Sequence, residues 1–216
     1  MRDRRISMIE NLFKVSILLG SLTVLLMVGS AEGTNPTPNS NPTRTVLPAR
    51  GQAYAFDFIL GTWKVSNQRL AKRLQHSHQW IDFESTDVQR KLPTGLGNIE
   101  VYKTSYWPNF VGMSLLLYNP DTHQWTIYWT DNRFSRGVLQ PPVAGSFNNG
   151  VGIFLGKDSF NGIPIIVRYT WRSLDHDHAR WTQAFSTDHG KSWETNWIMH
   201  FTRTTIRENQ KANNSQ

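Results

Sequence analysis

Short stretches of alternating apolar and polar residues follow one another between residues 54 and 205, with turn signals between them. Residues 124–131, for example, place Trp125, Ile127 and Trp129 on one face. Alternation of this kind is typical of half-buried β-strands, and helical periodicity is nearly absent from the segment. The sequence therefore predicts an all-β domain of about ten strands.

The turn signals indicate how these strands connect. Asn149-Gly150 and Asn161-Gly162 are two-residue hairpin signals, and Asn119-Pro120-Asp121-Thr122 is a turn by composition. Because no crossover helix separates the strands, consecutive strands should pair antiparallel. Closing such a sheet removes its exposed edges, so we predict a single antiparallel up-and-down β-barrel. The predicted strands are 63–70, 78–88, 99–107, 110–118, 124–131, 143–147, 151–160, one through 165–171, one through 181–185, and 193–203.

Composition limits the chemistry open to this domain. All nine tryptophans lie between Trp63 and Trp197, which places the core in this segment. Cysteine is absent, so the chain has no disulfide, no thiolate metal site and no lipoprotein anchor.

The formal charge of +7 falls to +5 without residues 1–31, which hold four positive and two negative side chains. The remaining excess of positive charge is modest. Basic residues cluster at 69–73 and at 90–91, where solvated strand ends explain them, so we predict no nucleic-acid partner.

The first 31 residues have the features of an export signal. Three arginines lie among the first five residues, residues 15–31 carry no charge, and Gly29-Ser30-Ala31 supplies the small residues preferred at a cleavage site. A cleaved signal peptide and a retained membrane anchor both remain open. Either places the domain outside the cytoplasm, periplasmic or secreted, because the arginines stay inside. Membrane contact is expected only through residues 12–31, if they are uncleaved.

The sequence divides into four parts. The signal or anchor, 1–31, is followed by a polar linker, 32–53, that cannot bury enough apolar surface to offset its ordering entropy. The barrel spans 54–205, and a flexible polar tail covers 206–216. The oligomeric state is left open.

A Gly-x-Trp step opens the first strand at Gly61 and Trp63. In a barrel the first and last strands pair, so Arg203 of the last strand should stack on the Trp63 ring through a cation–π contact. This pair is interpreted as structural, since it closes one end of the barrel.

Residues 186–193 match the Asp-box pattern, Ser/Thr-x-Asp-x-Gly-x-Ser/Thr-Trp. Asp188 can accept hydrogen bonds within its own loop, Gly190 can adopt a positive φ, and Trp193 can fold back over the turn. A single copy indicates a structural hairpin and carries no implied reaction.

The seven histidines give no metal site. The His76/His78 and His176/His178 pairs lack a third ligand at a recognisable spacing, so no metal is predicted. No cofactor is predicted either. Haem is disfavoured because strand alternation places His200 outside, on one face with Glu194, Asn196, Ile198 and Thr202, and opposite Trp193, Thr195, Trp197, Met199 and Phe201.

The predicted interior combines aromatic rings with a few polar groups. The candidate ligand-binding residues are Asn67, Arg69, Trp129, Trp171, Trp181, Gln183 and Trp197. The polar members either satisfy one another, meet water at the mouth, or bind the polar group of a ligand in an otherwise apolar pocket.

Catalytic residues are not predicted, because no nucleophile elbow, phosphate loop or zinc-protease motif occurs. The carboxylates near strands are Asp57, Asp82, Glu84, Asp131, Asp158 and Glu194. If the protein were an enzyme, Glu194 or Asp131 would be the acid or base at the mouth.

Several segments resemble a bacterial lipocalin-like domain of unknown function. They are residues 56–70, 127–129, 180–185 and 193–197, and the resemblance spans about 54–205. It implies a single barrel of the calycin kind and carries over no activity or ligand, although wider relatives bind hydrophobic small molecules, fatty acids or haem. Val65 stands where nitrobindin-like barrels repeat a glycine, which further disfavours haem.

Three functions remain open. The first is an exported barrel that binds a small apolar or amphipathic molecule, with Asn67, Arg69 and Gln183 at its polar group. The second is an enzyme that uses the same cavity. The third is a structural or interaction module of the envelope with a filled barrel, which the absence of a cavity would support.

Overall fold

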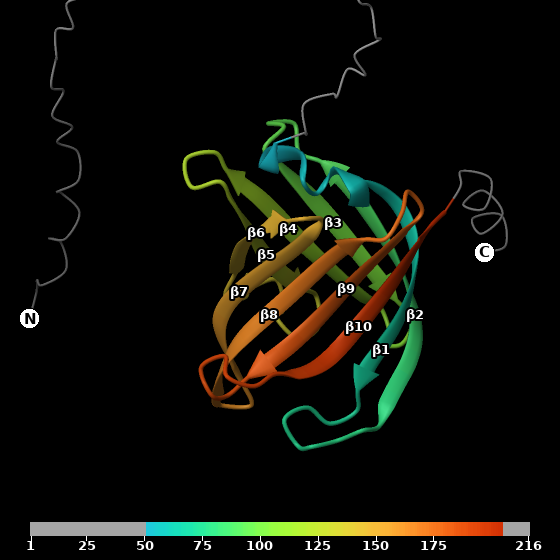
Figure 1. The fold of residues 1–216 in the computed structure, drawn as a ribbon. Coiled ribbons are helices and arrows are strands. Elements are labelled where there is room, and N and C mark those ends of the chain that lie inside the picture. The colour runs from blue at the N-terminus through green and yellow to red at the C-terminus, as the bar shows by residue number, and fades with distance from the viewer. Residues whose placement is uncertain (1–50, 205–216) are drawn as a thin grey trace, which may run out of the picture. The chain divides into compact units, whose positions relative to one another are not determined.

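Ten antiparallel strands close into one barrel in the computed structural model, which describes residues 51–204 (Figure 1). Each strand pairs with its neighbours in sequence, and β1 pairs with β10 to close the ring. The predicted fold class is therefore confirmed. The strands are β1 Gly61–Leu70, β2 Trp80–Lys91, β3 Gly97–Thr104, β4 Phe110–Asn119, β5 Gln124–Asp131, β6 Val143–Asn148, β7 Val151–Phe160, β8 Ile163–Ser173, β9 His178–Ser186 and β10 Glu194–Arg203.

Strand alternation decides which side chains enter the barrel. In β1, Trp63, Val65 and Asn67 are buried, whereas Lys64 and Ser66 are exposed. Every second residue of a strand points to the same face, so one face of β1 lies inside. The closing pair keeps this register, because Trp63 lies opposite Arg203 and Asn67 opposite Met199.

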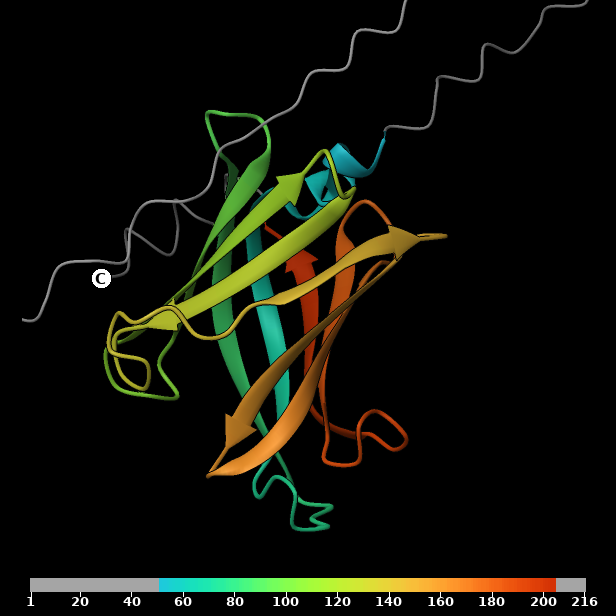
Figure 2. The same cartoon turned by 90° about the vertical axis from the view of Figure 1, so that its left-hand side faces the viewer.

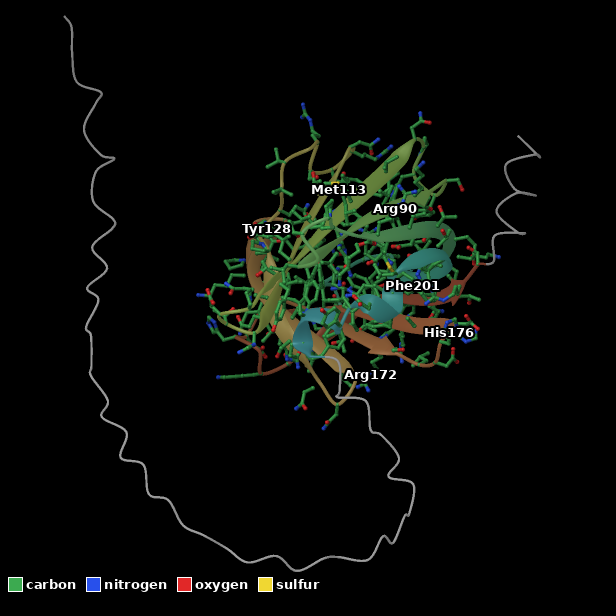
Figure 3. All side chains as sticks on the ribbon, turned by 90° about the horizontal axis from the view of Figure 1, so that it is seen from above. Arg90, Met113, Tyr128, Arg172, His176 and Phe201 are labelled. Atoms are coloured by element: carbon green, nitrogen blue, oxygen red, sulfur yellow. The ribbon has the colours of Figure 1, made fainter. Side chains whose placement is uncertain are left out.

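Two short 3-10 helices, η1 Gln52–Tyr54 and η2 Asp57–Ile59, cover one end of the barrel (Figures 1 and 2). Phe56, between them, is fully buried, and its ring centre lies 4.8 Å from that of Phe147 and 5.0 Å from that of Trp125. Figure 3 looks onto this end, where the strands form a ring around the packed interior. Aromatic packing therefore closes the barrel here.

Three residues of the predicted linker belong to this covered end. The Gln52 side chain donates to the Phe147 carbonyl at 2.7 Å, and the Gln52 carbonyl accepts from the Trp125 indole at 2.8 Å. Gln52 thus packs with the barrel, although it belongs to the predicted linker. A polar side chain there is ordered by hydrogen bonds, which an apolar pattern does not reveal.

Arg203 ties the last strand to the covered end. Its guanidinium carbon lies 4.0 Å from the centre of the Trp63 ring, and it donates to the carbonyls of Leu60 and Phe58 at 2.6 and 2.8 Å. Gly61 has a φ of +120°, and a Cβ there would lie 2.8 Å from Arg203 Nη1. The Gly-x-Trp step thus leaves space for the arginine that stacks on its tryptophan.

The predicted tight turns have the expected backbone. Both residues of Asn149-Gly150 and of Asn161-Gly162 have positive φ, as a type I′ hairpin requires. In the Asp-box loop, Asp188 accepts hydrogen bonds from the Ser186 and Ser192 hydroxyls, and Gly190 has a φ of +88°. The Trp193 indole donates to the Gly190 carbonyl at 3.0 Å, so this loop is held by its own side chains.

The expected alternation of the last strand is wrong at one place. A register shift between Thr195 and Trp197 turns Asn196 inward, where it is fully buried, and leaves Thr195 exposed. An extra residue on one strand reverses the facing of the residues before it. Beyond the bulge the prediction holds: His200 is exposed on the outside of β10.

The predicted signal or anchor (1–31), most of the linker (32–50) and the tail (206–216) lie outside the described residues. Within residues 51–204, no helix is both long and apolar enough to cross a membrane.

Candidate functional site

A cavity of about 330 Å³ lies inside the barrel. Its wall comes from β1, β3–β5 and β7–β10, and it extends to Arg73, Trp107 and Phe134 in loops at the end opposite η1 and η2 (Figure 2). Ligand pockets usually measure about 300–1,000 Å³, so this volume lies at their lower limit. The lumen is therefore not filled by side chains.

The cavity brings together most of the predicted ligand-binding residues. Its wall includes Arg69, Trp129, Trp171, Trp181, Gln183 and Trp197, but not Asn67. The Trp181 ring centre lies 4.9 Å from that of Tyr169 and 5.8 Å from that of Trp197. These rings form a continuous aromatic wall through β8, β9 and β10.

Asn67 holds the barrel wall together instead of facing the cavity. Its side chain donates to the Ser85 hydroxyl at 2.8 Å and the Val65 carbonyl at 3.1 Å. Its amide oxygen accepts from the Tyr102 hydroxyl and the Trp197 indole, both at 3.1 Å. Burial raises the pKa of Tyr102 further above neutrality, so the hydroxyl stays protonated and donates this bond. Asn67 therefore has no free group to offer a ligand.

Arg69 presents a cation without a counter-ion. Its guanidinium carbon lies 5.2 Å from the ring centre of Trp107 and 5.3 Å from that of Trp197. Its buried Nε has no hydrogen-bond partner, and no ion pair within residues 51–204 includes it. Burial lowers the pKa of Arg69, although arginine stays charged at neutral pH.

Arg73 lines the cavity next to Arg69. Its guanidinium carbon lies 4.2 Å from the Phe160 ring centre and 5.7 Å from that of Phe185. Burial, followed by the charge of Arg69, lowers the pKa of Arg73 to about 10. Two cations that repel each other beside aromatic rings would gain from an anion between them.

Gln183 is only partly engaged by protein. Its amide nitrogen donates to the Asn196 side-chain oxygen at 2.7 Å. Asn196 reaches this position because of the β10 bulge, and alternation alone had assigned it to the outside. Gln183 lines the cavity, whereas Asn196 is fully buried in the barrel wall.

Trp129 takes its position from a glycine. A Cβ at Gly112, on the neighbouring β4, would lie 2.2 Å from Trp129 Cη2. The Trp129 indole also donates to Asp131 Oδ2 at 3.2 Å. The ring therefore lies across the bare backbone of β4, and its place in the cavity wall depends on this glycine.

Asp131 and Glu194, the two predicted acid–base candidates, both serve the loops. Asp131 Oδ1 accepts from the backbone amides of Arg133, Phe134 and Ser135. Both Glu194 oxygens accept from the Leu74 amide, at 2.8 and 3.0 Å. Each carboxylate therefore fixes a loop and is poorly suited to transfer protons.

The sequence analysis missed Asp87 and Glu100, a buried carboxyl pair on β2 and β3. Asp87 is fully buried, and Glu100 is 7% exposed and lines the cavity. Burial, followed by the charge of Glu100, raises the pKa of Asp87 well above its ordinary value. The register of β2 turns Asp87 inward with Ser85 and Gln89, because Asp87 lies directly opposite the buried Trp63.

Within residues 51–204, no three His, Asp or Glu side chains gather as metal ligands would. The paired histidines are on the surface, where His176 contacts Asp177 and His178 contacts Asp175. His176 lies in the loop between β8 and β9 and His178 begins β9, at the covered end of the barrel, whereas His76 and His78 lie exposed between β1 and β2.

The fold and the cavity together define a closed, ten-stranded antiparallel β-barrel with an aromatic internal pocket. No protein-family model matches the sequence, and no curated protein matches it.

Proposed function

We propose that the barrel binds a small amphipathic molecule whose anionic group lies at Arg69 and whose apolar part lies among the tryptophans. The observation that carries this proposal is Arg69 in the cavity wall, half-buried, with no ion pair within residues 51–204 and with a buried Nε that has no hydrogen-bond partner. Burying a charge without a partner is costly, and an entering carboxylate or phosphate would supply the missing partner through charge-assisted hydrogen bonds.

The cavity limits the size of this molecule. At about 30 Å³ per water, 330 Å³ corresponds to about eleven water molecules. A ligand of about a dozen non-hydrogen atoms is therefore favoured over a long-chain lipid. The other charged groups of the wall are Arg73, Glu100, Asp131 and Asp158, so the anion is expected near the two arginines.

The alternatives find less support. A filled structural barrel disagrees with a cavity of this volume. An enzyme that uses Asp131 or Glu194 disagrees with the hydrogen bonds that occupy both carboxylates. Binding without turnover is accordingly the function we propose.

The test compares three probes that share one apolar part: 4-phenylbutanoic acid, 4-phenylbutanol and 4-phenylbutylamine. Binding is measured by calorimetry and by tryptophan fluorescence. The acid should bind at least about tenfold more tightly than the alcohol, because a hydrogen bond to a charged group contributes about 1.5–3 kcal/mol. Equal binding of all three, or none by any, would contradict the proposal.

Arg69→Met should remove the preference for the acid. Arg90→Met is the matched control, because Arg90 is exposed on the outside of β2 (Figure 3). Loss of the preference in both variants would point to a general charge effect and would contradict a role for Arg69.

We also propose that the barrel is a lipocalin-like domain that acts outside the cytoplasm. The support is the resemblance over 54–205 and the arginine-led, uncharged N-terminal stretch. Fractionation of cells that express the full chain tests the location. Protein found only in the cytoplasm would contradict it.

A further inference from the structure

The inward faces of β2 and β3 are polar, whereas most of the interior is aromatic or aliphatic. These two adjacent strands hold half of the buried polar residues of the described chain: Ser85, Asp87, Gln89, Asn98, Glu100 and Thr104. Of these six residues, Glu100 is the one that lines the cavity, and the others lie around it in the barrel wall.

Several of these polar groups lack partners. Neither Asp87 oxygen has a hydrogen-bond partner with normal geometry within residues 51–204, and neither does either polar side-chain atom of Gln89, which is 2% exposed. Gln89 lies directly opposite Glu100 on the neighbouring strand. A buried polar atom without a hydrogen-bond partner is unfavourable, so these groups gain from any partner that reaches them.

One shared proton relieves part of this cost. Burial raises the pKa of Asp87, and the protonated Asp87 carboxyl can donate a hydrogen bond to Glu100. The remaining acceptor capacity belongs to Glu100, which reaches the cavity. Asp131, by contrast, accepts backbone amides at Oδ1 and the Trp129 indole at Oδ2, and Asp158 accepts from the Ser159 amide.

We propose that Glu100, supported by Asp87, is a second polar subsite that binds a hydrogen-bond donor of the ligand, a hydroxyl or an ammonium group. This inference rests on the function proposed above, and it adds the class of ligand: a small hydroxy acid or amino acid derivative with an apolar middle. Arg69 and Arg73 hold the anionic end, and Glu100 binds the donor.

Matched probes test this subsite in the full-length protein. Phenylacetic and 4-phenylbutanoic acid are each compared with their para-hydroxy and para-aminomethyl derivatives, because two chain lengths sample two separations between acid and donor. In the wild type, at least one donor-bearing probe should bind about tenfold or more tightly than its parent acid, since a donor meets a buried, charged acceptor.

Three variants test whether Glu100 causes the tighter binding of a donor-bearing probe. In Glu100→Met, the donor-bearing probe and its parent acid should bind with about equal affinity, and the parent should still bind. In Glu100→Gln, the ratio of the two affinities should fall only partly, since an amide oxygen still accepts a hydrogen bond. Glu84→Gln is the control, because Glu84 is exposed on the outside of β2; it should leave the ratio unchanged.

The outcomes separate the two proposals. Tight binding of the parent acids with no gain from any donor would overturn the Glu100 subsite and leave the proposed function intact. Absence of binding by every acid would overturn both. A gain that persists in Glu100→Met would place the donor elsewhere and overturn the subsite.

Discussion

Replacing Asn67 by alanine tests whether this residue holds the wall or binds the ligand. The substitution removes the acceptor of the Tyr102 hydroxyl and the Trp197 indole and leaves the Ser85 hydroxyl without its donor. Asn67 is fully buried, so water cannot replace these bonds. At about 1–3 kcal/mol for each buried group left without a partner, and with partial relaxation, we expect a loss of about 3–5 kcal/mol in the free energy of unfolding.

Urea denaturation followed by tryptophan fluorescence measures this loss. For a domain of this size the melting temperature should fall by roughly 6–20 °C. The control is Gln68→Ala, because Gln68 is the next residue of β1 and bonds only to Asp82 at the exposed surface. That variant should stay within about 0.5 kcal/mol of the wild type. A loss below about 1 kcal/mol for Asn67→Ala would refute the structural role.

For three further substitutions, the structure predicts whether the stability of the protein falls or rises. Gly112→Ala should cost about 1–3 kcal/mol and weaken ligand binding, because its Cβ would meet the Trp129 ring; Gly51→Ala, with open space around it, is the control, and equal effects in a thermal melt would contradict the packing. Gly190→Val should cost about 1–2 kcal/mol in the same assay, since a β-branched residue resists a φ of +88°, and unchanged stability would contradict the turn geometry. Asp87→Asn should stabilise the protein at pH 7. The raised pKa makes the folded state hold a proton that the unfolded state releases above about pH 3.9, so wild-type stability falls as the pH rises from there. The advantage of the variant should vanish near pH 4 in urea melts, and an advantage independent of pH would contradict the assignment.

Most of the correct predictions come from the alternation of inward and outward residues along the strands. Hairpin signals and apolar alternation follow from local backbone preferences, so the barrel, its strand segments and the inward tryptophans could be read directly. The contact between Trp63 and Arg203 also follows, because closing the sheet brings the first and last strands together.

The bulge in β10 and the Asp87–Glu100 pair could not be predicted from hairpin signals and apolar alternation. A one-residue shift reverses facing without any change in composition, which is why Asn196 was expected outside. The inward face of β2 holds the polar Ser85, Asp87 and Gln89, while the apolar Val88 is only half-buried, so an apolar pattern does not mark Asp87 as buried. The roles of Asn67 and Asp131 depend on partners far apart in sequence or on loop geometry, which spacing does not specify.

The most direct test of a binding cavity is a crystal structure of the protein with 4-phenylbutanoic acid. We predict the phenyl ring in the cavity against the aromatic wall that includes Trp181 and Trp197, with the carboxylate within hydrogen-bond distance of the Arg69 guanidinium. An empty cavity at saturating probe, or a probe bound only on the outside of the barrel, would contradict this prediction.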